Sequence, residues 1–143
     1  MPYKINKNNN TISAEYKVRN YHVDSYGHVN NAAYLLFLED ARTDFFSYFG
    51  FPLSLLAKNN VYVFITEINI KYIKPLHLDD VITVTGNISN IKKVRATWKQ
   101  NIFRDKELVA DATVYSAFLN GSGKIIKIPE YLLEPLNSIH IEE

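Results

Sequence analysis

The sequence has no cysteine and almost no excess of charge of either sign. The missing thiols exclude disulfides, thiolate nucleophiles and cysteine-ligated metal sites, and they fit a reducing compartment. Lys and Arg total 16 against 15 Asp and Glu, which leaves a formal net charge of +1. A balance this even gives no indication of a nucleic-acid partner or of an anionic membrane surface.

Long apolar runs are also absent. No run reaches the ~18 residues that a membrane-spanning helix needs, and residues 1–6 do not form the apolar core of a signal peptide. We therefore expect a cytoplasmic protein without a membrane partner. With 143 residues and 47% hydrophobic content, the chain suits one globular domain, residues 1–143, with a sizeable core.

The stretch from Arg19 to Arg42 has a polar first half and an apolar second half. Residues 22–31 carry a carboxylate, two histidines, a glycine and two asparagines. Asn30 or Asn31 is a good N-cap for the helix that follows, because a short amide side chain accepts hydrogen bonds from the first-turn N–H groups. Those N–H groups carry the positive end of the helix dipole, so they suit a carbonyl oxygen that becomes negative.

Asp24 lies one short loop before this helix start, and Gly27 lets the loop turn through backbone angles closed to other residues. A carboxylate beside a helix end that can bind an oxyanion provides the two groups needed to attack an acyl group. The alternative is that Asp24 only bonds the backbone of its own loop, which is the usual role of Asp before a glycine.

Hydrophobic periodicity divides the chain into one long helix and several strands. The helix runs from about Asn30 to about Phe49, with Gly50 and Pro52 ending it. Its polar residues form one narrow stripe, so other elements must wrap the rest of its surface; they are Asp40, Thr43, Asp44 and Ser47.

Residues 7–10 are a polar run that we expect to fray or turn. Alternating or β-branched segments predict the strands, which are 11–19, 61–74, 81–91, 92–103, 107–119 and 124–128. Short helices are expected at 53–58 and 129–136. Short connections favour antiparallel neighbours, so the pattern predicts an α+β fold in which a five- to six-stranded antiparallel sheet wraps the long helix.

This arrangement, with a specific string of residues before the helix, resembles the hotdog-fold acyl-CoA thioesterases of the 4-hydroxybenzoyl-CoA thioesterase family. The string is Asp24-Ser25-Tyr26-Gly27-His28-Val29-Asn30-Asn31-Ala32-Ala33-Tyr34, with Val18-Arg19 before it and Glu39-x-Ala41-Arg42 after it. Residues 68–80 look like the family's second strand and the turn that closes it. The resemblance covers residues 12–128.

The resemblance implies an enzyme that hydrolyses an acyl thioester of coenzyme A, or of acyl carrier protein, to an acid and a thiol. It implies that Asp24 is the catalytic carboxylate, acting as general base or nucleophile, and that the amide at Asn31 polarises the thioester carbonyl. Gly27 and His28 then belong to the active-site loop. No metal and no cofactor are implied, and the site resembles a seam between subunits, which predicts a homodimer or homotetramer.

Three nearby residues leave alternatives open. His28 either shapes the loop or contacts the thioester. A related hotdog lineage has a catalytic glutamate on the buried helix, but Glu39 is favoured as a structural partner of Arg42 three residues on. His22 stands where the family commonly has another polar group, and a cation there would lower the pKa of Asp24.

Candidate substrate contacts are less specific. Tyr34 and Trp98 either line an acyl pocket or form plain core. Lys93 and Arg95 either meet the phosphates of coenzyme A or belong to a solvated strand face. Two other activities remain: an enoyl-CoA hydratase on the same fold, and a non-catalytic acyl-CoA-binding module.

Overall fold

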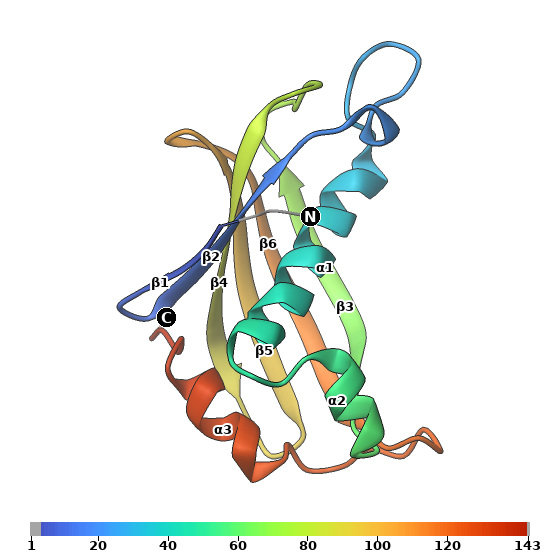
Figure 1. The fold of residues 1–143 in the computed structure, drawn as a ribbon, viewed down its shortest axis with the longest axis vertical. Helices are drawn as coiled ribbons and strands as arrows, with labels where there is room; N and C mark the ends of the chain where they lie inside the picture. Colours follow the sequence, from blue (N-terminus) through green and yellow to red (C-terminus); the bar gives the residue numbers. More distant parts are fainter. Residues whose placement is uncertain (1–3, 143) are drawn as a thin grey trace.

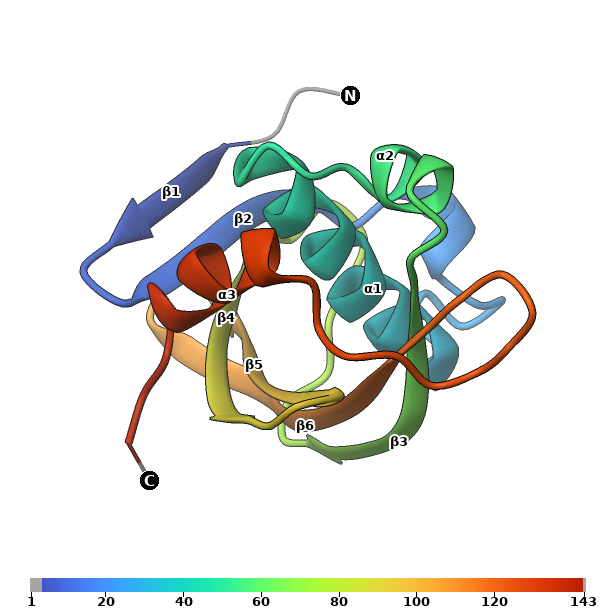
Figure 2. The ribbon, with the colours of Figure 1, turned by 90° about the horizontal axis from the view of Figure 1, so that it is seen from below.

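The computed structural model describes residues 4–142. Six strands form one antiparallel sheet that curls around a central helix, α1 (Figures 1 and 2). Two shorter helices, α2 and α3, lie outside the curl near one end of the molecule. The elements are β1 (Ile5–Asn8), β2 (Thr11–Lys17), α1 (Asn31–Tyr48), α2 (Leu53–Lys58), β3 (Tyr62–Tyr72), β4 (Val81–Ile91), β5 (Arg95–Arg104), β6 (Glu107–Leu119) and α3 (Glu130–Asn137).

Helix α1 is enclosed as its narrow polar stripe predicts. Its fully buried side chains are each at most 1% exposed and pack against the concave face of the sheet; they are Phe37, Leu38, Ala41 and Phe45. Phe45 stacks on Trp98 of β5 and lies so close to β4 that a Cβ at Gly86 would be 2.5 Å from its ring. Because Gly86 has no side chain, the ring of Phe45 can occupy this position in the core.

The strand order is β1-β2-β4-β5-β6-β3, so β1 and β3 are the two edges. Strand β3 contains a bulge between Ile65 and Glu67, where β3 has one residue more than the paired stretch of β6. The extra residue changes which side chains face inward. Val63 and Ile65 before the bulge and Ile68 and Ile70 after it are all half-buried, although strict alternation would turn the second pair outward.

Two segments differ from the sequence-based prediction. Residues 5–8 form β1, which pairs with β2 across a turn at Asn9, whose φ is +57°; the polar run therefore does turn, but a strand precedes it. Residues 124–128 do not form a strand, and a single bridge between Ile125 and Leu119 stands in its place. The long helix, the helices α2 and α3 and the other strands are confirmed. No helix among residues 4–142 is long and apolar enough to cross a membrane.

Candidate active site

The loop that precedes α1 is closed on itself by backbone hydrogen bonds. The N–H of Asp24 donates to the carbonyl of His28 at 2.8 Å, and the N–H of Gly27 donates to the carbonyl of Asp24 at 3.0 Å. Gly27 has a φ of +79°, a conformation that side chains rarely adopt. Val23 and Val29 pair on either side. The loop thus holds its carboxylate at a fixed place beside the helix start.

The two carboxylate oxygens of Asp24 have different surroundings. Oδ1 accepts hydrogen bonds from the N–H groups of Tyr26, at 2.9 Å, and His28, at 3.2 Å. The turn-forming role that Asp often has in loops is therefore real here. Within residues 4–142, no group donates a hydrogen bond to Oδ2, and the side chain is exposed. One oxygen shapes the loop while the other stays available to a substrate or a water molecule.

The start of α1 supplies a backbone donor next to this carboxylate. Asn30, not Asn31, is the N-cap, because its side-chain oxygen accepts from the N–H of Ala33 at 2.9 Å. Asn31 is the first helical residue, and the first N–H groups of a helix have no partner within it. In the described residues nothing else accepts from the N–H of Asn31. This group carries part of the positive end of the helix dipole.

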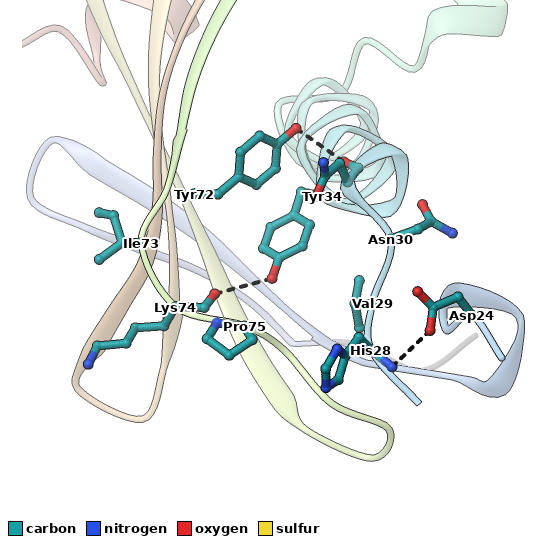
Figure 3. Close-up of a pocket in the computed structure, with 10 residues that line it drawn as sticks. Asp24, His28, Val29, Asn30, Tyr34, Tyr72, Ile73, Lys74 and Pro75 are labelled. Atoms are coloured by element: carbon teal, nitrogen blue, oxygen red, sulfur yellow. Dashed lines mark hydrogen bonds between the residues drawn. The ribbon is translucent and has the colours of Figure 1, made fainter. Parts of the chain in front are cut away.

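A cavity of about 540 Å³ joins the loop to the helix start (Figure 3). Asp24, His28 and Asn31 line it together, so the structure brings these three predicted site residues to one place. Gly27 belongs to the same loop but does not line the cavity. The remaining wall comes from the helix start and from the end of β3 with the chain after it, and it consists of Val29, Asn30, Tyr34, Tyr72, Ile73, Lys74 and Pro75.

Tyr34 and Tyr72 connect the helix to β3 and to the chain beyond it. The hydroxyl of Tyr34 donates to the carbonyl of Lys74 at 3.2 Å and accepts from the N–H of Leu76 at 3.0 Å (Figure 3). Burial raises the pKa of Tyr34 above its ordinary range, so the hydroxyl keeps its proton. Tyr72 donates from its hydroxyl to the carbonyl of Asn31 at 3.3 Å. Tyr34 is buried and also lines the cavity, and its hydroxyl is hydrogen-bonded to the backbone.

Tyr72 was not predicted to be a site residue. The signal in the sequence that could have indicated it is an aromatic residue at the end of a strand, shortly before Pro75. His28 lies beside a second unanticipated residue, His77, with ring centroids 5.7 Å apart and a backbone bridge between the two. The bridge ties the loop to the chain between β3 and β4. The backbone of His28 therefore helps to hold the loop in place.

His22 does not act as a cation near Asp24. Its ring is buried against Phe37, and its Nδ1 accepts a hydrogen bond from the N–H of Arg19 at 2.9 Å. Burial, followed by the charge of Arg19, lowers the pKa of His22 below 6.5. The ring is neutral at neutral pH, so the charge of His22, which the sequence left open, is not that of a cation.

Lys93 and Arg95 lie away from the Asp24 cavity of their own chain. Lys93 precedes β5 instead of belonging to it, and it lines a small surface hollow with Lys92 and Lys127. Arg95 opens β5 and lines a separate hollow of about 580 Å³ with Lys92 and Tyr115. Within one chain these cations therefore form no part of the candidate site.

Glu39 and Arg42 do not form the ion pair that their spacing suggested. In the described part of the chain no carboxylate oxygen lies within 4.0 Å of the Arg42 guanidinium. Glu39 is exposed and affects Arg42 only through its charge. Both residues line a second cavity with Trp98, further along α1 and apart from Asp24. Residues 4–142 contain no group of three or more His, Asp or Glu side chains placed to share a metal ion.

The model of the thioesterase-like superfamily matches residues 18–136, which include the loop, α1 and the strands β3 to β6. The chain belongs to the thioesterase-like superfamily. This confirms the hotdog fold, the thioesterase resemblance and the thioester-hydrolase class that were predicted from the sequence.

Individual members of the superfamily are similar over most of the chain. The long-chain acyl-CoA thioesterase FadM of Escherichia coli K12 is 35% identical over 105 residues, covering 72% of this chain and 79% of FadM. A hypothetical protein from Aquifex aeolicus superposes with a TM-score of 0.83 at 30% identity, covering 87% and 98% of the two chains. YbaW, a probable thioesterase from Escherichia coli, superposes with a TM-score of 0.72 at 31% identity, covering 89% and 97%.

Proposed function

We propose that the protein hydrolyses acyl-CoA thioesters and that Asp24 carries the reaction. The observation behind this proposal is that Asp24 Oδ2 and the N–H of Asn31, both without a hydrogen-bond partner among residues 4–142, belong to residues that line one cavity. A carboxylate and an oxyanion donor are the two groups that attack on a thioester carbonyl requires. FadM, a relative whose name gives acyl-CoA as its substrate, supports coenzyme A as the carrier.

In this mechanism the thioester carbonyl oxygen accepts a hydrogen bond from the N–H of Asn31. Oδ2 of Asp24 then either removes a proton from water, which attacks the carbonyl carbon, or attacks the carbon itself to give a mixed anhydride that water opens. Both routes release a free acid and the thiol of coenzyme A. Oδ1 keeps its two backbone hydrogen bonds throughout, so the loop holds the reacting oxygen in place.

The test is hydrolysis of a panel of acyl-CoAs of increasing chain length, with free thiol followed by a thiol reagent. We expect thiol release for at least one chain length. Parallel reactions with the same acyl groups on acyl carrier protein separate the two carriers. Addition of water to an enoyl-CoA without thiol release would instead support a hydratase, and acyl-CoA binding without turnover would support a non-catalytic module.

We also propose that the protein is a homodimer or homotetramer and that its subunits join through β3. The two edges of the sheet differ in a way that supports this. β1 has four residues and a polar sequence, which is typical of an edge protected from pairing. β3 has 11 residues with unpaired backbone groups along its outer side, and it exposes Tyr62, Phe64 and Tyr72. Large exposed aromatic residues on a long free edge are typical of an interface.

Light scattering of the purified protein tests this proposal. We expect a dimer or larger assembly at micromolar concentration, and Phe64→Lys, at a side chain 54% exposed on β3, should weaken it. Ile125→Lys is a matched control, because that side chain is 55% exposed but lies off the β3 edge. A stable monomer with intact activity would contradict the proposal.

A further inference from the structure

The second cavity lies along the same side of α1 as the active-site cavity. Its volume is about 150 Å³, close to that of an engineered cavity that holds benzene. Most of its wall is apolar, and the side chains that carry charge or a hydroxyl are Glu39, Arg42 and Thr43. The apolar residues of the wall are Phe46, Leu53, Val63, Ile65 and Trp98.

Arg42 is a buried cation with most of its donors unused. It is 7% exposed, and its Nη1 donates to Oε1 of Gln100 at 2.9 Å. A guanidinium has five N–H donors, and this is the one hydrogen bond that Arg42 makes within residues 4–142. Burial lowers the pKa of Arg42 to about 10, so the group is still charged at neutral pH.

Gln100 fixes the position of this guanidinium. Gln100 is fully buried on β5, and its Nε2 donates to the carbonyl of Leu38 at 3.1 Å. That bond orients the amide so that its oxygen faces Arg42. Among residues 4–142 no fully buried side-chain nitrogen lacks a partner, so the unpaired nitrogens of Arg42 keep some accessible surface. A largely buried charge without a contacting carboxylate is costly, and an acceptor oxygen from a ligand in the cavity can reach these nitrogens and offset part of the cost.

Residues of α1 and β3 line both cavities, and the apolar strip of these two elements that lies between the cavities is called the seam here. Asn31, Leu35 and Arg42 share one face of the helix because they are four and seven residues apart. Between the cavities the half-buried side chains of the seam are Leu35, Ile68 and Ile70. Eleven residues of helix separate Asn31 from Arg42, a rise of about 16 Å at ~1.5 Å per residue.

We propose that the Arg42 cavity binds a hydroxyl group at the far end of a long acyl chain whose thioester lies at Asp24. This inference rests on the proposed function and adds a substrate class to it. An extended chain advances roughly 1.2 Å per bond, as the polypeptide backbone does. About 12 carbons therefore span the seam.

A hydroxyl suits the polar groups of this cavity better than a carboxylate does. It accepts a hydrogen bond from the free N–H groups of Arg42 and donates its own proton to a carboxylate such as Glu39. A substrate carboxylate would meet the negative charge of Glu39 and could donate nothing. An unsubstituted chain end would leave the guanidinium without a partner.

Matched substrates test the proposal through kcat/KM. We expect 12-hydroxydodecanoyl-CoA to exceed dodecanoyl-CoA by about tenfold, because hydrogen bonds to charged groups are stronger than neutral ones. The ω-carboxylate analogue should be poorer than the hydroxyl compound. 4-Hydroxybutanoyl-CoA should show no advantage over butanoyl-CoA, because its hydroxyl cannot reach Arg42. A ratio at or below one for the 12-carbon pair, or the same preference at both lengths, would overturn the proposal.

Arg42→Met should bring the 12-carbon ratio to one or below, since a hydroxyl then enters an apolar pocket. Asp40→Asn, on the exposed side of the same helix, is the matched control and should keep the ratio. If Arg42→Met does not fold, Arg42→Met/Gln100→Leu removes both hydrogen-bond partners together, a change that folded proteins tolerate better. An unchanged ratio in either folded variant would assign hydroxyl recognition to other residues and overturn the proposal.

Failure of the proposed function is distinguishable from failure of this inference. If no acyl-CoA releases thiol, calorimetry with 12-hydroxydodecanoate and dodecanoate tests the cavity directly. Tighter binding of the hydroxy acid by the unmodified protein, lost in Arg42→Met, supports the inference. Equal affinities contradict it.

Discussion

The first turn of α1 differs from the face of the helix that packs on the sheet. At the first turn the N–H of Asn31 faces no acceptor among residues 4–142, and the neighbouring Asp24 is exposed. On the packed face, Phe45 is fully buried, and Gln100 of β5, which enters the core there, is hydrogen-bonded through both amide atoms. The free N–H of Asn31 lies where a ligand can reach it, whereas Phe45 and Gln100 stabilise the fold by packing and by internal hydrogen bonds. Substitutions at the two places should therefore separate activity from stability.

The largest effect on stability is expected on the packed face of α1. Phe45→Ala removes a fully buried ring that stacks on Trp98 and should lower the free energy of unfolding by about 3–5 kcal/mol. Urea denaturation measures this. Leu36→Ala, on the same helix but 52% exposed, is the control and should change stability by less than about 1 kcal/mol. Similar losses in the two variants would mean that the helix is not enclosed as described.

A smaller effect is expected at the first turn. Asn30→Ala removes the side chain that caps the N–H of Ala33 and should lower the free energy of unfolding by about 0.5–2 kcal/mol. Thioesterase activity should also fall, because the turn that we propose to bind the oxyanion would fray. Asn31→Ala changes the neighbouring side chain but keeps its backbone N–H, so its stability should stay within about 0.5 kcal/mol. Thermal unfolding of the pair distinguishes the cap from its neighbour, and equal melting temperatures would contradict the assignment.

The smallest expected effect is on the pH dependence of stability. It involves His22, which packs on Phe37 of α1 next to the loop that carries Asp24. Its folded-state pKa lies below the ordinary 6.5 because of burial and then Arg19, so the unfolded chain binds this proton more readily. Stability from this group is full above about pH 6.5 and is lost as the pH falls below it. His22→Asn keeps an acceptor for Arg19 without titrating. Its melting temperature should fall less than that of the unmodified protein between pH 7.5 and 5.5, and parallel curves would show that His22 does not contribute.

Much of the fold follows from patterns that act locally. The narrow polar stripe of α1 predicts an enclosed helix because a mostly apolar surface must be covered, and Phe45 and Leu38 bear this out. Residues 124–128 look like a strand, but strand formation depends on continuous pairing with a partner, and this segment makes one bridge, at Ile125, and isolated backbone hydrogen bonds from Ile126 and Ile128. β1 was missed for the converse reason, because its polar sequence is stabilised by pairing with β2 and carries little pattern of its own.

The residues of the candidate site also divide into those whose grouping follows from local sequence and those whose contacts depend on tertiary structure. Asp24, His28 and Asn31 are close in sequence, so one loop brings them together and their grouping was predictable. Tyr72 reaches the site from β3, and its contact with Asn31 depends on how the sheet curls. The neutrality of His22 and the unpaired state of Arg42 depend on burial, which sequence spacing does not give. Spacing alone predicted an ion pair for Arg42, which residues 4–142 do not contain, and it left the charge of His22 open.

We propose that the reacting carboxylate is Asp24 in the loop and not Glu39 on the helix. Asp24→Asn and Glu39→Gln each remove one negative charge at nearly constant size, so hydrolysis of one unsubstituted acyl-CoA by both variants compares the two directly. Asp24→Asn should lose on the order of a hundredfold or more in kcat with little change in melting temperature, since general base catalysis is typically worth about 10²- to 10⁴-fold. Glu39→Gln should lose far less. A folded Asp24→Asn that stays active beside a folded but inactive Glu39→Gln would move the catalytic group to the helix and contradict the account.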